Sequence, residues 1–272
     1  MDALAVVLEK PRHIALNRLA ITAPGPADVV VEVAFSGVST GTERLLWSGD
    51  MPAFPGMGYP LVPGYESIGR VVEAGAESGR SEGDWVFVPG ANCYGDVRGL
   101  FGGSASRVTL AGARVTPIDE NLGERGVLMA LAATAYHAMA PGFAAPDLIV
   151  GHGALGRLLA RIAVASGQPA PTVWEINPAR MDGAQGYAVV RPEDDPRRDY
   201  SAIYDVSGDS SLLDSLVGRL KKGGEIVLAG FYAERLSFDF PPAFMKEARL
   251  RAAAEFNPGD IAGVNALLSS GA

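Results

Sequence analysis

A glycine-rich stretch in the middle of the chain has the residue types and the spacing to bind a diphosphate. Residues 148–156 are a short apolar run followed by the spacing G-x-G-x-x-G. Gly151 permits a tight turn, Gly153 lets the backbone approach a pyrophosphate, and Gly156 lets a helix pack closely on a strand. Free N–H groups and the helix dipole favour an anion at the start of that helix. The predicted dinucleotide contacts are Gly151, Gly153, Ala154, Leu155 and Gly156.

The residues around this motif predict a strand–helix–strand unit. Apolar residues recur over 155–162 at the spacing of one helical face, and a second strand is expected just before Glu175. This acid is placed to accept hydrogen bonds from a ribose 2′-hydroxyl and to repel a 2′-phosphate, which favours NAD over NADP. Arg180 follows closely and would cover the adenine, unless it is an ordinary surface arginine. The alternative for the whole unit is an α/β domain that has the glycine turn without a nucleotide.

The composition is that of an ordinary globular protein. The chain has 272 residues, 48% of them hydrophobic and 20% charged, which is enough for two domains with sizeable cores. The net charge of −8, without a Lys/Arg-rich run, argues against nucleic acid or an anionic membrane as the main partner. A single cysteine, Cys93, excludes an intramolecular disulfide and a cysteine-rich zinc site. Without a leader or a run of ~20 apolar residues, we expect a cytoplasmic protein with no integral membrane segment.

The chain divides into two regions of different pattern. Residues 1–122 are predicted to form a β-rich domain, because short Val-, Ala- and Phe-rich runs alternate with glycine and proline. Residues 123–260 alternate strands with helices, which predicts a doubly wound, mainly parallel sheet and an α/β fold. Residues 261–272 read as a helix that begins an incomplete return segment to the first domain. The elements expected in the second domain are helix 156–165, strands 173–175 and 203–206, helix 211–220, and strands 225–229 and 250–256.

Four short segments occur as landmarks along the chain. Residues 36–43 read SGVSTGTE, residues 63–69 PGYESIG, residues 83–86 GDWV and residues 134–138 TAYHA. In this order, and with a β-rich region before the glycine motif, they resemble the medium-chain dehydrogenase/reductase superfamily. The first departs from the superfamily's G-x-C-x-T-D pattern by one extra residue before the acid. The resemblance implies a GroES-like substrate domain, a Rossmann NAD-binding domain, and a cofactor contact at Thr134.

Longer blocks narrow this resemblance. Residues 39–46, 55–66, 89–103 and 204–209 resemble the zinc-lacking dehydrogenases of bacteriochlorophyll synthesis, and the similarity covers essentially the whole chain. It implies NAD-dependent oxidation of the 3-(1-hydroxyethyl) group of a chlorophyllide or bacteriochlorophyllide to 3-acetyl. The implied partner is therefore a chlorin or bacteriochlorin. It also implies a homodimer built by extending the Rossmann sheets edge to edge.

The same resemblance bears on metal binding. Many members of the superfamily hold a catalytic zinc with Cys, His and Cys, and those positions correspond here to Ser39, Tyr65 and Ala130. These side chains cannot form a tetrahedral site of nitrogen and sulfur ligands, and only Glu66 remains as a potential ligand. We therefore expect no catalytic metal.

Oxidation of an alcohol without a metal needs side chains that take the hydroxyl proton. The candidates are Ser39, Thr40, Tyr65, Glu66, Glu43 and His137. Ser39 and Thr40 correspond to substrate-facing positions in relatives, and Tyr65 replaces a zinc ligand. Either glutamate could accept the proton or orient its acceptor, and a free imidazole titrates near ~6.5.

These candidates also have structural interpretations. Glu43 and Glu66 could hold a loop or pair with an arginine such as Arg44. His137 could be a packing or surface histidine. A further histidine, His152, lies inside the glycine turn and is expected to contribute only its backbone.

The segment 47–60 is rich in aromatic, Met and Pro residues, which would suit a flat apolar macrocycle. The candidate lining is Trp47, Phe54, Met57, Tyr59, Tyr94 and Phe101. The alternative is a satellite core beneath a long loop. In the Rossmann half, Ser207 and Phe231 follow two predicted strands and would contact the nicotinamide, because ligands bind at the carboxyl ends of such strands.

Three functions fit the sequence. The first is the zinc-free, NAD-dependent dehydrogenase of a hydroxyethyl chlorin. The second is a zinc-independent quinone or enone reductase of the same superfamily, which Glu175 disfavours because such reductases usually prefer NADPH. The third is a non-catalytic nucleotide-binding protein, whose signature would be NAD binding without turnover.

Overall fold

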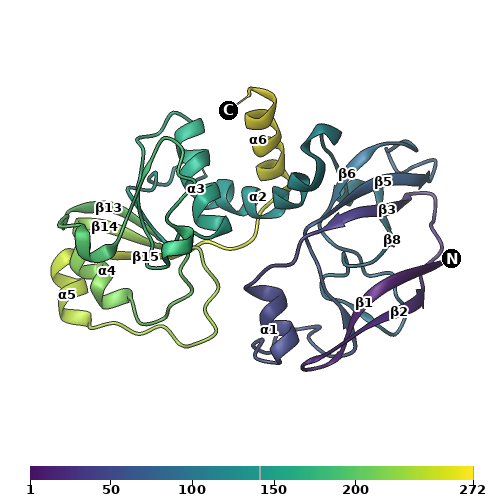
Figure 1. Cartoon of the computed structure of the whole chain (residues 1–272), viewed down its shortest axis with the longest axis horizontal. Coiled ribbons are helices and arrows are strands. Elements are labelled where there is room, and N and C mark those ends of the chain that lie inside the picture. The colour runs from purple at the N-terminus through teal and green to yellow at the C-terminus, as the bar shows by residue number, and fades with distance from the viewer. Residues whose placement is uncertain (141, 272) are drawn as a thin grey trace. The chain divides into compact units, whose positions relative to one another are not determined.

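The computed structural model describes residues 1–140 and 142–271, which form two compact units (Figure 1). Unit 1 is Met1–Ala130, and unit 2 begins at Leu131. The division therefore falls later than the predicted boundary at residue 122. The 3₁₀ helix Glu120–Leu128 explains the difference, because it packs on the strands of unit 1: a Cβ on Gly126 would lie 3.0 Å from Ile68.

Unit 1 contains two mostly antiparallel sheets. The five-stranded sheet has the order β8-β3-β5-β6-β9. Its strands are β3 (Asp28–Ser36), β5 (Ser67–Ala74), β6 (Trp85–Val88), β8 (Arg107–Ala111) and β9 (Thr116–Pro117). The four-stranded sheet has the order β2-β1-β4-β7. Its strands are β1 (Asp2–Lys10), β2 (His13–Ala20), β4 (Leu61–Val62) and β7 (Arg98–Gly99). The β-rich first domain is thus confirmed.

Small β-branched side chains make the core of unit 1. Val29, Val31, Val71 and Val86 are fully buried and belong to one cluster, as strand residues that fill a pleated surface do. The short helix α1 (Thr42–Ser48) follows β3 and turns only two residues inward. One is Leu46, which packs in a separate apolar cluster, and the other is an acid, Glu43.

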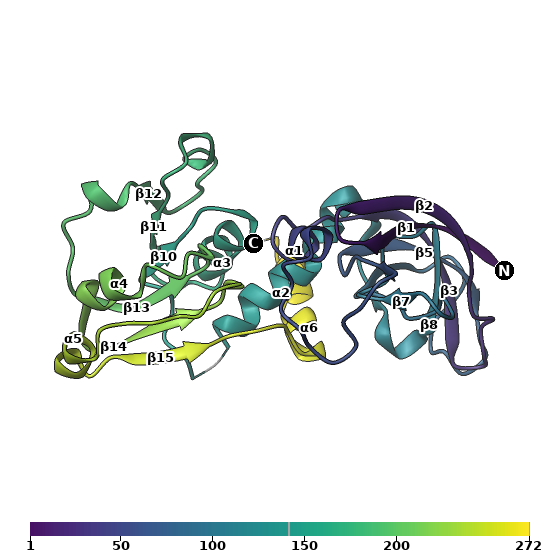
Figure 2. The same ribbon diagram turned by 90° about the horizontal axis from the view of Figure 1, so that it is seen from below.

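Unit 2 is a doubly wound domain around a six-stranded sheet (Figures 1 and 2). All its strand pairs are parallel, in the order β12-β11-β10-β13-β14-β15. Its strands are β10 (Leu148–Val150), β11 (Thr172–Trp174), β12 (Ala188–Val190), β13 (Tyr200–Asp205), β14 (Leu220–Leu228) and β15 (Arg249–Ala252). This order confirms the predicted Rossmann fold, whose sequence direction reverses between β10 and β13.

Helices cover both faces of this sheet. In Figure 1, α3 (Ala154–Ala165) lies on one face, and α4 (Leu213–Arg219) and α5 (Phe240–Lys246) lie on the other. The pattern of burial agrees, because Leu216 and Ala243 share a core cluster with the sheet residue Ile203.

The residues expected to begin a return segment form a helix within unit 2. Helix α6 (Pro258–Ser269) starts with a capping box in which Asn257 and Asp260 satisfy each other's backbone N–H groups. It packs on α2 (Met129–Ala138), so closely that a Cβ on Gly263 would lie 2.5 Å from the ring of Tyr136.

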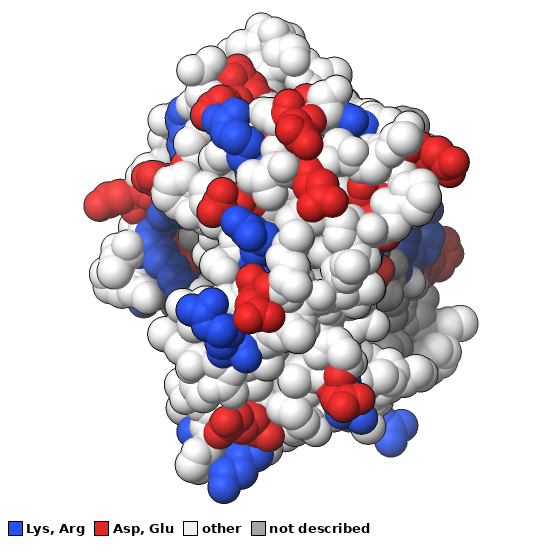
Figure 3. All heavy atoms as spheres, turned by 90° about the vertical axis from the view of Figure 1, so that its right-hand side faces the viewer, with Lys and Arg blue, Asp and Glu red and all other residues white. Residues whose placement is uncertain are grey.

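The helices and the charged surface bear on membrane and nucleic-acid partners. No helix among the described residues is both long enough and apolar enough to cross a membrane. On the face drawn in Figure 3, Lys and Arg side chains are interspersed with Asp and Glu side chains rather than gathered apart.

The glycine turn allows a first prediction about stability. A Cβ on Gly156 would overlap the carbonyl oxygen of Gly151, whereas a Cβ on Gly153 would meet nothing within 4 Å. We expect Gly156→Ala to lower the free energy of unfolding by about 1–3 kcal/mol, as overpacking does. The control, Gly153→Ala, should cost less than about 1 kcal/mol, the scale of an unfavourable helix cap. Denaturant unfolding of both variants measures this, and equal stabilities would contradict it.

Candidate active site

Two buried glutamates form the centre of the candidate site in unit 1. Glu43 lies in the first turn of α1 and is 6% exposed, and Glu66 precedes β5 and is 4% exposed. One oxygen of Glu43, Oε2, accepts a hydrogen bond from the backbone N–H of Ser39 at 3.0 Å. The Oε1 atoms of both glutamates are buried without a hydrogen-bond partner among the described residues. Such an arrangement opposes ionisation of both carboxyl groups at once.

The pKa values of the two carboxyl groups reflect this burial. Desolvation raises the pKa of Glu43 to about 7, and the negative charge of Glu66 acts in the same direction against backbone hydrogen bonds. Desolvation raises the pKa of Glu66 to about 6, although a hydrogen bond with Tyr65 opposes the rise. Groups with these pKa values exchange protons near neutral pH, which is what a general base requires.

Tyr65 and Ser39 add two hydroxyl groups to the pair. Desolvation raises the pKa of Tyr65 to about 12, although hydrogen bonds with the side chains of Ser39 and Thr42 oppose the rise. The phenol therefore stays protonated and can relay a proton, but it is not the final acceptor. Ser39 Oγ accepts hydrogen bonds from the backbone N–H groups of Gly41 and Thr42, at 3.1 and 3.2 Å. Its remaining hydrogen-bond partner is the Tyr65 hydroxyl.

A glycine is required beside this cluster. A Cβ on Gly37 would overlap Glu66 Oε2. The backbone N–H of Gly37 also donates to the carbonyl oxygen of Glu66 at 2.7 Å. The absence of a side chain at this position therefore lets the Glu66 carboxyl group lie against the end of β3. Thr40, the remaining hydroxyl candidate of this segment, is exposed.

Three aromatic candidates for the substrate pocket offer apolar surface. Trp47, Phe54 and Phe101 are all exposed. Phe101 stands edge-on to Tyr65, with the ring centroids 5.6 Å apart. The candidate proton-transfer group therefore has an exposed apolar neighbour.

The other three pocket candidates lie in apolar cores. Met57 and Tyr59 pack against the cluster around Leu46, which is the satellite core that the sequence left as an alternative. Tyr94 is 3% exposed within the main core of unit 1, and its hydroxyl donates to the carbonyl of Gly102. Tyr94, which the sequence analysis expected in a pocket wall, therefore has almost no exposed surface in unit 1.

The positions that correspond to zinc ligands carry no zinc-binding set. Ser39 and Tyr65 belong to the hydroxyl and carboxyl cluster, and Ala130 is fully buried with a methyl side chain. Cys93 lies in the core of unit 1. Within residues 1–140 and 142–271, no three His, Cys, Asp or Glu side chains gather in a group that could hold a metal ion. Hydroxyl and carboxyl oxygens do not make the nitrogen and sulfur set that holds catalytic zinc in this superfamily.

The glycine turn of unit 2 has the geometry of an anion site. Gly151 follows β10 with φ +104°, a conformation that favours glycine. Gly153 caps α3 without a side-chain hydrogen bond, and the space beside its Cα is open. The backbone N–H groups of Ala154 and Leu155 open the helix there. These residues fit the diphosphate of a dinucleotide, whose charge the helix start favours.

The second strand end at this crevice is that of β13. A Cβ on Gly151 would lie 3.4 Å from Ser207, so the turns after β10 and β13 are neighbours. Ser207 Oγ donates to Asp205 Oδ1 at 2.6 Å. Next to it, a Cβ on Gly208 would lie 3.3 Å from the carbonyl oxygen of Phe231, whose ring is exposed. The structure thus brings Ser207 and Phe231 together with the glycine turn.

Glu175 lies at the end of β11 and binds backbone N–H groups. Its Oε2 accepts from His152 at 2.9 Å, and its Oε1 accepts from Ile176 and Asn177 at 2.9 and 2.8 Å. Desolvation raises the pKa of Glu175, but these hydrogen bonds outweigh it and the pKa is lowered. The acid is therefore a carboxylate beside the turn. Arg180 is exposed in the following loop.

The two candidates on α2 belong to unit 2. His137 Nδ1 lies 2.9 Å from Asp260 Oδ2 and 3.4 Å from Asn257 Nδ2, at the start of α6. These contacts fit the alternative interpretation of His137, which is that it is a packing histidine. Thr134 is half-buried on the same helix.

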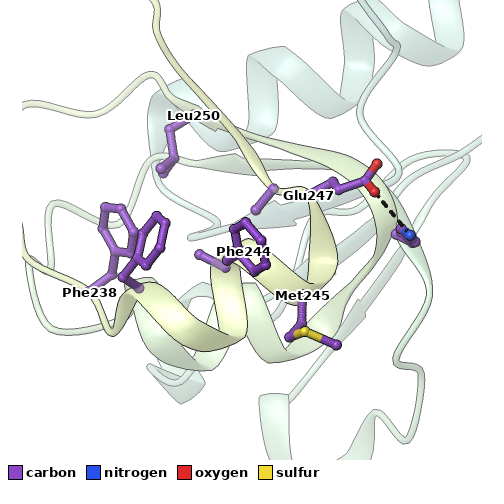
Figure 4. A pocket seen from close by; sticks show the side chains of 9 residues that line it. Phe238, Phe244, Met245, Glu247 and Leu250 are labelled. Atoms are coloured by element: carbon purple, nitrogen blue, oxygen red, sulfur yellow. Dashed lines mark ion pairs between the residues drawn. The ribbon is translucent and has the colours of Figure 1, made fainter.

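An apolar hollow also occurs on unit 2, away from the glycine turn. It has a volume of about 440 Å³ and is lined by α5 and the start of β15. Figure 4 shows Phe238, Phe244 and Leu250 around it, with Glu247 at its rim paired with Lys222. Because it lies at the amino ends of β14 and β15, it is separate from the crevice at the carboxyl ends of the strands.

Comparisons with known proteins agree with this geometry. Residues 25–120 match the family described as the alcohol dehydrogenase GroES-like domain. The chain is 58% identical to the 2-desacetyl-2-hydroxyethyl bacteriochlorophyllide A dehydrogenase of Rhodobacter capsulatus, over 100% of this chain and 87% of the relative. The enzyme of the same name from Cereibacter sphaeroides is 55% identical with the same coverage.

The solved structures show the same fold. The 2R,3R-butanediol dehydrogenase from Bacillus subtilis superposes with a TM-score of 0.83 at 20% identity, over 99% of this chain and 88% of the other. The first relatives resemble the chain much more closely and along its whole length. The chain therefore belongs to the 2-desacetyl-2-hydroxyethyl bacteriochlorophyllide A dehydrogenases, within the medium-chain dehydrogenase/reductase superfamily.

Proposed function

We propose that this chain is a zinc-independent dehydrogenase that oxidises the hydroxyethyl group of a bacteriochlorophyllide to an acetyl group with NAD. This hydroxyethyl group is the one called the 3-(1-hydroxyethyl) group in the sequence analysis and the 2-hydroxyethyl group in the names of the relatives. The observation that carries the proposal is the buried pair Glu43 and Glu66, joined to Ser39 and Tyr65 at positions that correspond to zinc ligands. The 58% identity to an enzyme of that name supports the substrate.

The residues of unit 2 would hold the cofactor. NAD, when bound, accepts the hydride that leaves the carbinol carbon. Gly153 and the start of α3 would bind the diphosphate, and the Glu175 carboxylate would face the ribose. Because a carboxylate repels a 2′-phosphate, this arrangement supports NAD rather than NADP.

The residues of unit 1 would move the proton. The hydroxyl proton of the substrate passes to Ser39 or Tyr65, and the hydroxyl that receives it releases its own proton to Glu66. Glu43 shares that proton through the coupling between the two carboxyl groups. The relay ends on a carboxyl group that titrates near neutral pH, and the hydroxyl in between gives up one proton as it receives the other, so that no strong base is left in the site.

Exposed aromatic side chains would receive the macrocycle. Phe101 stands beside Tyr65, and Trp47 and Phe54 are exposed in the same unit. Flat apolar rings pack well on aromatic side chains, which supports a large conjugated substrate.

The decisive test is turnover by metal-stripped protein. We expect purified protein, dialysed against a strong chelator, to form NADH from NAD and a 3-(1-hydroxyethyl) bacteriochlorophyllide, with the acetyl product identified by absorbance and mass. The rate should stay within about twofold of the untreated protein, because the site lacks the nitrogen and sulfur ligands that would hold a catalytic zinc ion. Loss of activity that added zinc restores would refute the zinc-independent chemistry. NAD binding without turnover would favour a non-catalytic protein, and NADPH-dependent reduction of quinones or enones would favour a reductase.

The carboxyl pair predicts a pH dependence. The base must be ionised, so kcat/KM should rise with pH through the range of the raised pKa values, about 6 to 7, and then level off. We expect Glu66→Gln to lower kcat by about 10²–10⁴-fold and to remove most of this rise. The control is Glu73→Gln on the exposed side of β5, which should leave both unchanged. An unaltered profile in Glu66→Gln would show that another group accepts the proton.

The same pair of carboxyl groups predicts that the stability of the fold falls as the pH rises, whereas kcat/KM rises. The pKa values of both carboxyl groups in the folded chain lie above the 4.5 of a free glutamate, so the stabilisation is complete below that pH and is lost as the pH rises through about 6 to 7. Glu43→Gln cannot ionise. It should therefore unfold at a higher temperature than the parent at about pH 8, with a smaller difference at about pH 5. Calorimetric scans at both pH values measure this, and a variant that is less stable at the higher pH would contradict it.

The cofactor assignment is tested at Gly153. The space beside its Cα is open and its φ of −76° suits any residue, so Gly153→Val should fold normally. The added side chain would occupy the space proposed for the diphosphate, and we expect NAD affinity to fall by about tenfold or more. Calorimetric titration with NAD and NADP checks both points, because the parent should prefer NAD. Equal NAD binding by parent and variant would place the diphosphate elsewhere.

A further inference from the structure

His152 lies inside the glycine turn, and each of its polar groups has a partner. The residue is fully buried, at 0% exposure. Its backbone N–H donates to Glu175 Oε2 at 2.9 Å, and its carbonyl oxygen accepts from Arg157 Nε at 3.2 Å. In the ring, Nδ1 lies 2.6 Å from the carbonyl oxygen of Arg180, and Nε2 lies 2.7 Å from the Tyr187 hydroxyl. The residue thus joins three separate segments of unit 2.

These partners determine which nitrogen carries the hydrogen. A carbonyl oxygen can only accept, so Nδ1 donates to Arg180. Nε2 is then the acceptor, and the Tyr187 hydroxyl donates to it. Burial lowers the pKa of His152, with Arg157 acting in the same direction, which agrees with a neutral ring. The imidazole is therefore a fixed donor and acceptor rather than an acid or base.

We propose that His152 is a positioning residue for the dinucleotide, which holds the loop of residues 176–187 against the glycine turn through the Arg180 carbonyl. This inference rests on the proposed function, because it takes the ligand of the turn to be NAD. The loop begins directly after the acid proposed for the ribose and carries the exposed Arg180. Arg157 Nη2 donates to the same carbonyl at 2.9 Å. The side chains of His152 and Arg157 therefore both bind the loop at the carbonyl oxygen of Arg180.

The surroundings of the His152 ring indicate that it positions the loop and does not take part in the chemical step. His152 is fully buried, and both of its ring nitrogens are occupied, by the Arg180 carbonyl oxygen and the Tyr187 hydroxyl. Its loss should therefore raise the KM and the Kd for NAD while kcat stays nearly constant.

The experiment compares His152→Leu with His152→Asn in the full-length protein. The Asn side chain keeps an N–H that can donate to the Arg180 carbonyl, and Leu has none. We expect His152→Leu to bind NAD about tenfold more weakly, as the loss of one buried hydrogen bond would give, with kcat within about twofold. His152→Asn should recover NAD binding to within about threefold of the parent. The control is the exposed His13→Leu, which lies in unit 1 and should bind NAD as the parent does.

Hydrogen exchange distinguishes positioning from general structural support. In His152→Leu, amide exchange should be faster over residues 176–187 while the remainder of unit 2 keeps the parent's rates. An increase throughout unit 2, equal affinity losses in the Asn and Leu variants, or unchanged NAD binding in His152→Leu would each overturn the inference. If the Leu variant does not fold, the Asn variant alone tests the inference. A His152→Asn variant whose affinity for NAD is about tenfold lower than the parent's would overturn the inference. Failure of the parent itself to bind NAD would instead refute the proposed function.

Discussion

The candidate chemistry depends on two carboxyl groups that are buried close together without a cation. Glu43 and Glu66 each have an oxygen that no described residue satisfies, and the charge of one raises the pKa of the other. In a medium of low dielectric constant, such a pair retains a proton to a higher pH than free carboxyl groups do. The local structure serves this pair: α1 turns Glu43 inward, Gly37 leaves room for Glu66, and Tyr65 bridges to the hydroxyls.

Unit 2 solves the opposite electrostatic problem, because it must accept negative charge rather than retain a proton. It does so with backbone groups: the helix start at Gly153 has no capping side chain, and the N–H groups around Glu175 hold that carboxylate ionised. Both features lie at the carboxyl ends of the strands, where the strand order also brings the turns after β10 and β13 together. The fold thus provides N–H donors at the edge where a dinucleotide would bind.

The sequence predicted those features that depend on local pattern. The G-x-G-x-x-G turn and the alternating elements gave the Rossmann unit, because they are set by backbone requirements that the sequence displays directly. Aromatic composition does not distinguish a pocket wall from a core, and Tyr94, expected in a wall, packs in the core of unit 1. The two compact units divide after residue 130 rather than at the predicted 122, because the packing of Glu120–Leu128 on unit 1 is a tertiary contact that the sequence does not display. The side chain of His152 was overlooked, although a histidine between two glycines of a tight turn was the available signal.

In the proposed mechanism, a carboxyl pair in place of a metal would change what limits the reaction. A Lewis acid would stabilise the alkoxide directly, whereas a general base removes the proton only when it is ionised and well matched to the donor. Raised pKa values of about 6 and 7 make the proton transfer less uphill than an ordinary carboxylate would, while leaving the base ionised above neutrality. Burial that destabilises unit 1 at high pH is thus the same property that makes the pair an effective acceptor. The proposed activity and the loss of stability at high pH therefore have one physical origin. A substitution that removes the loss of stability should also remove the activity.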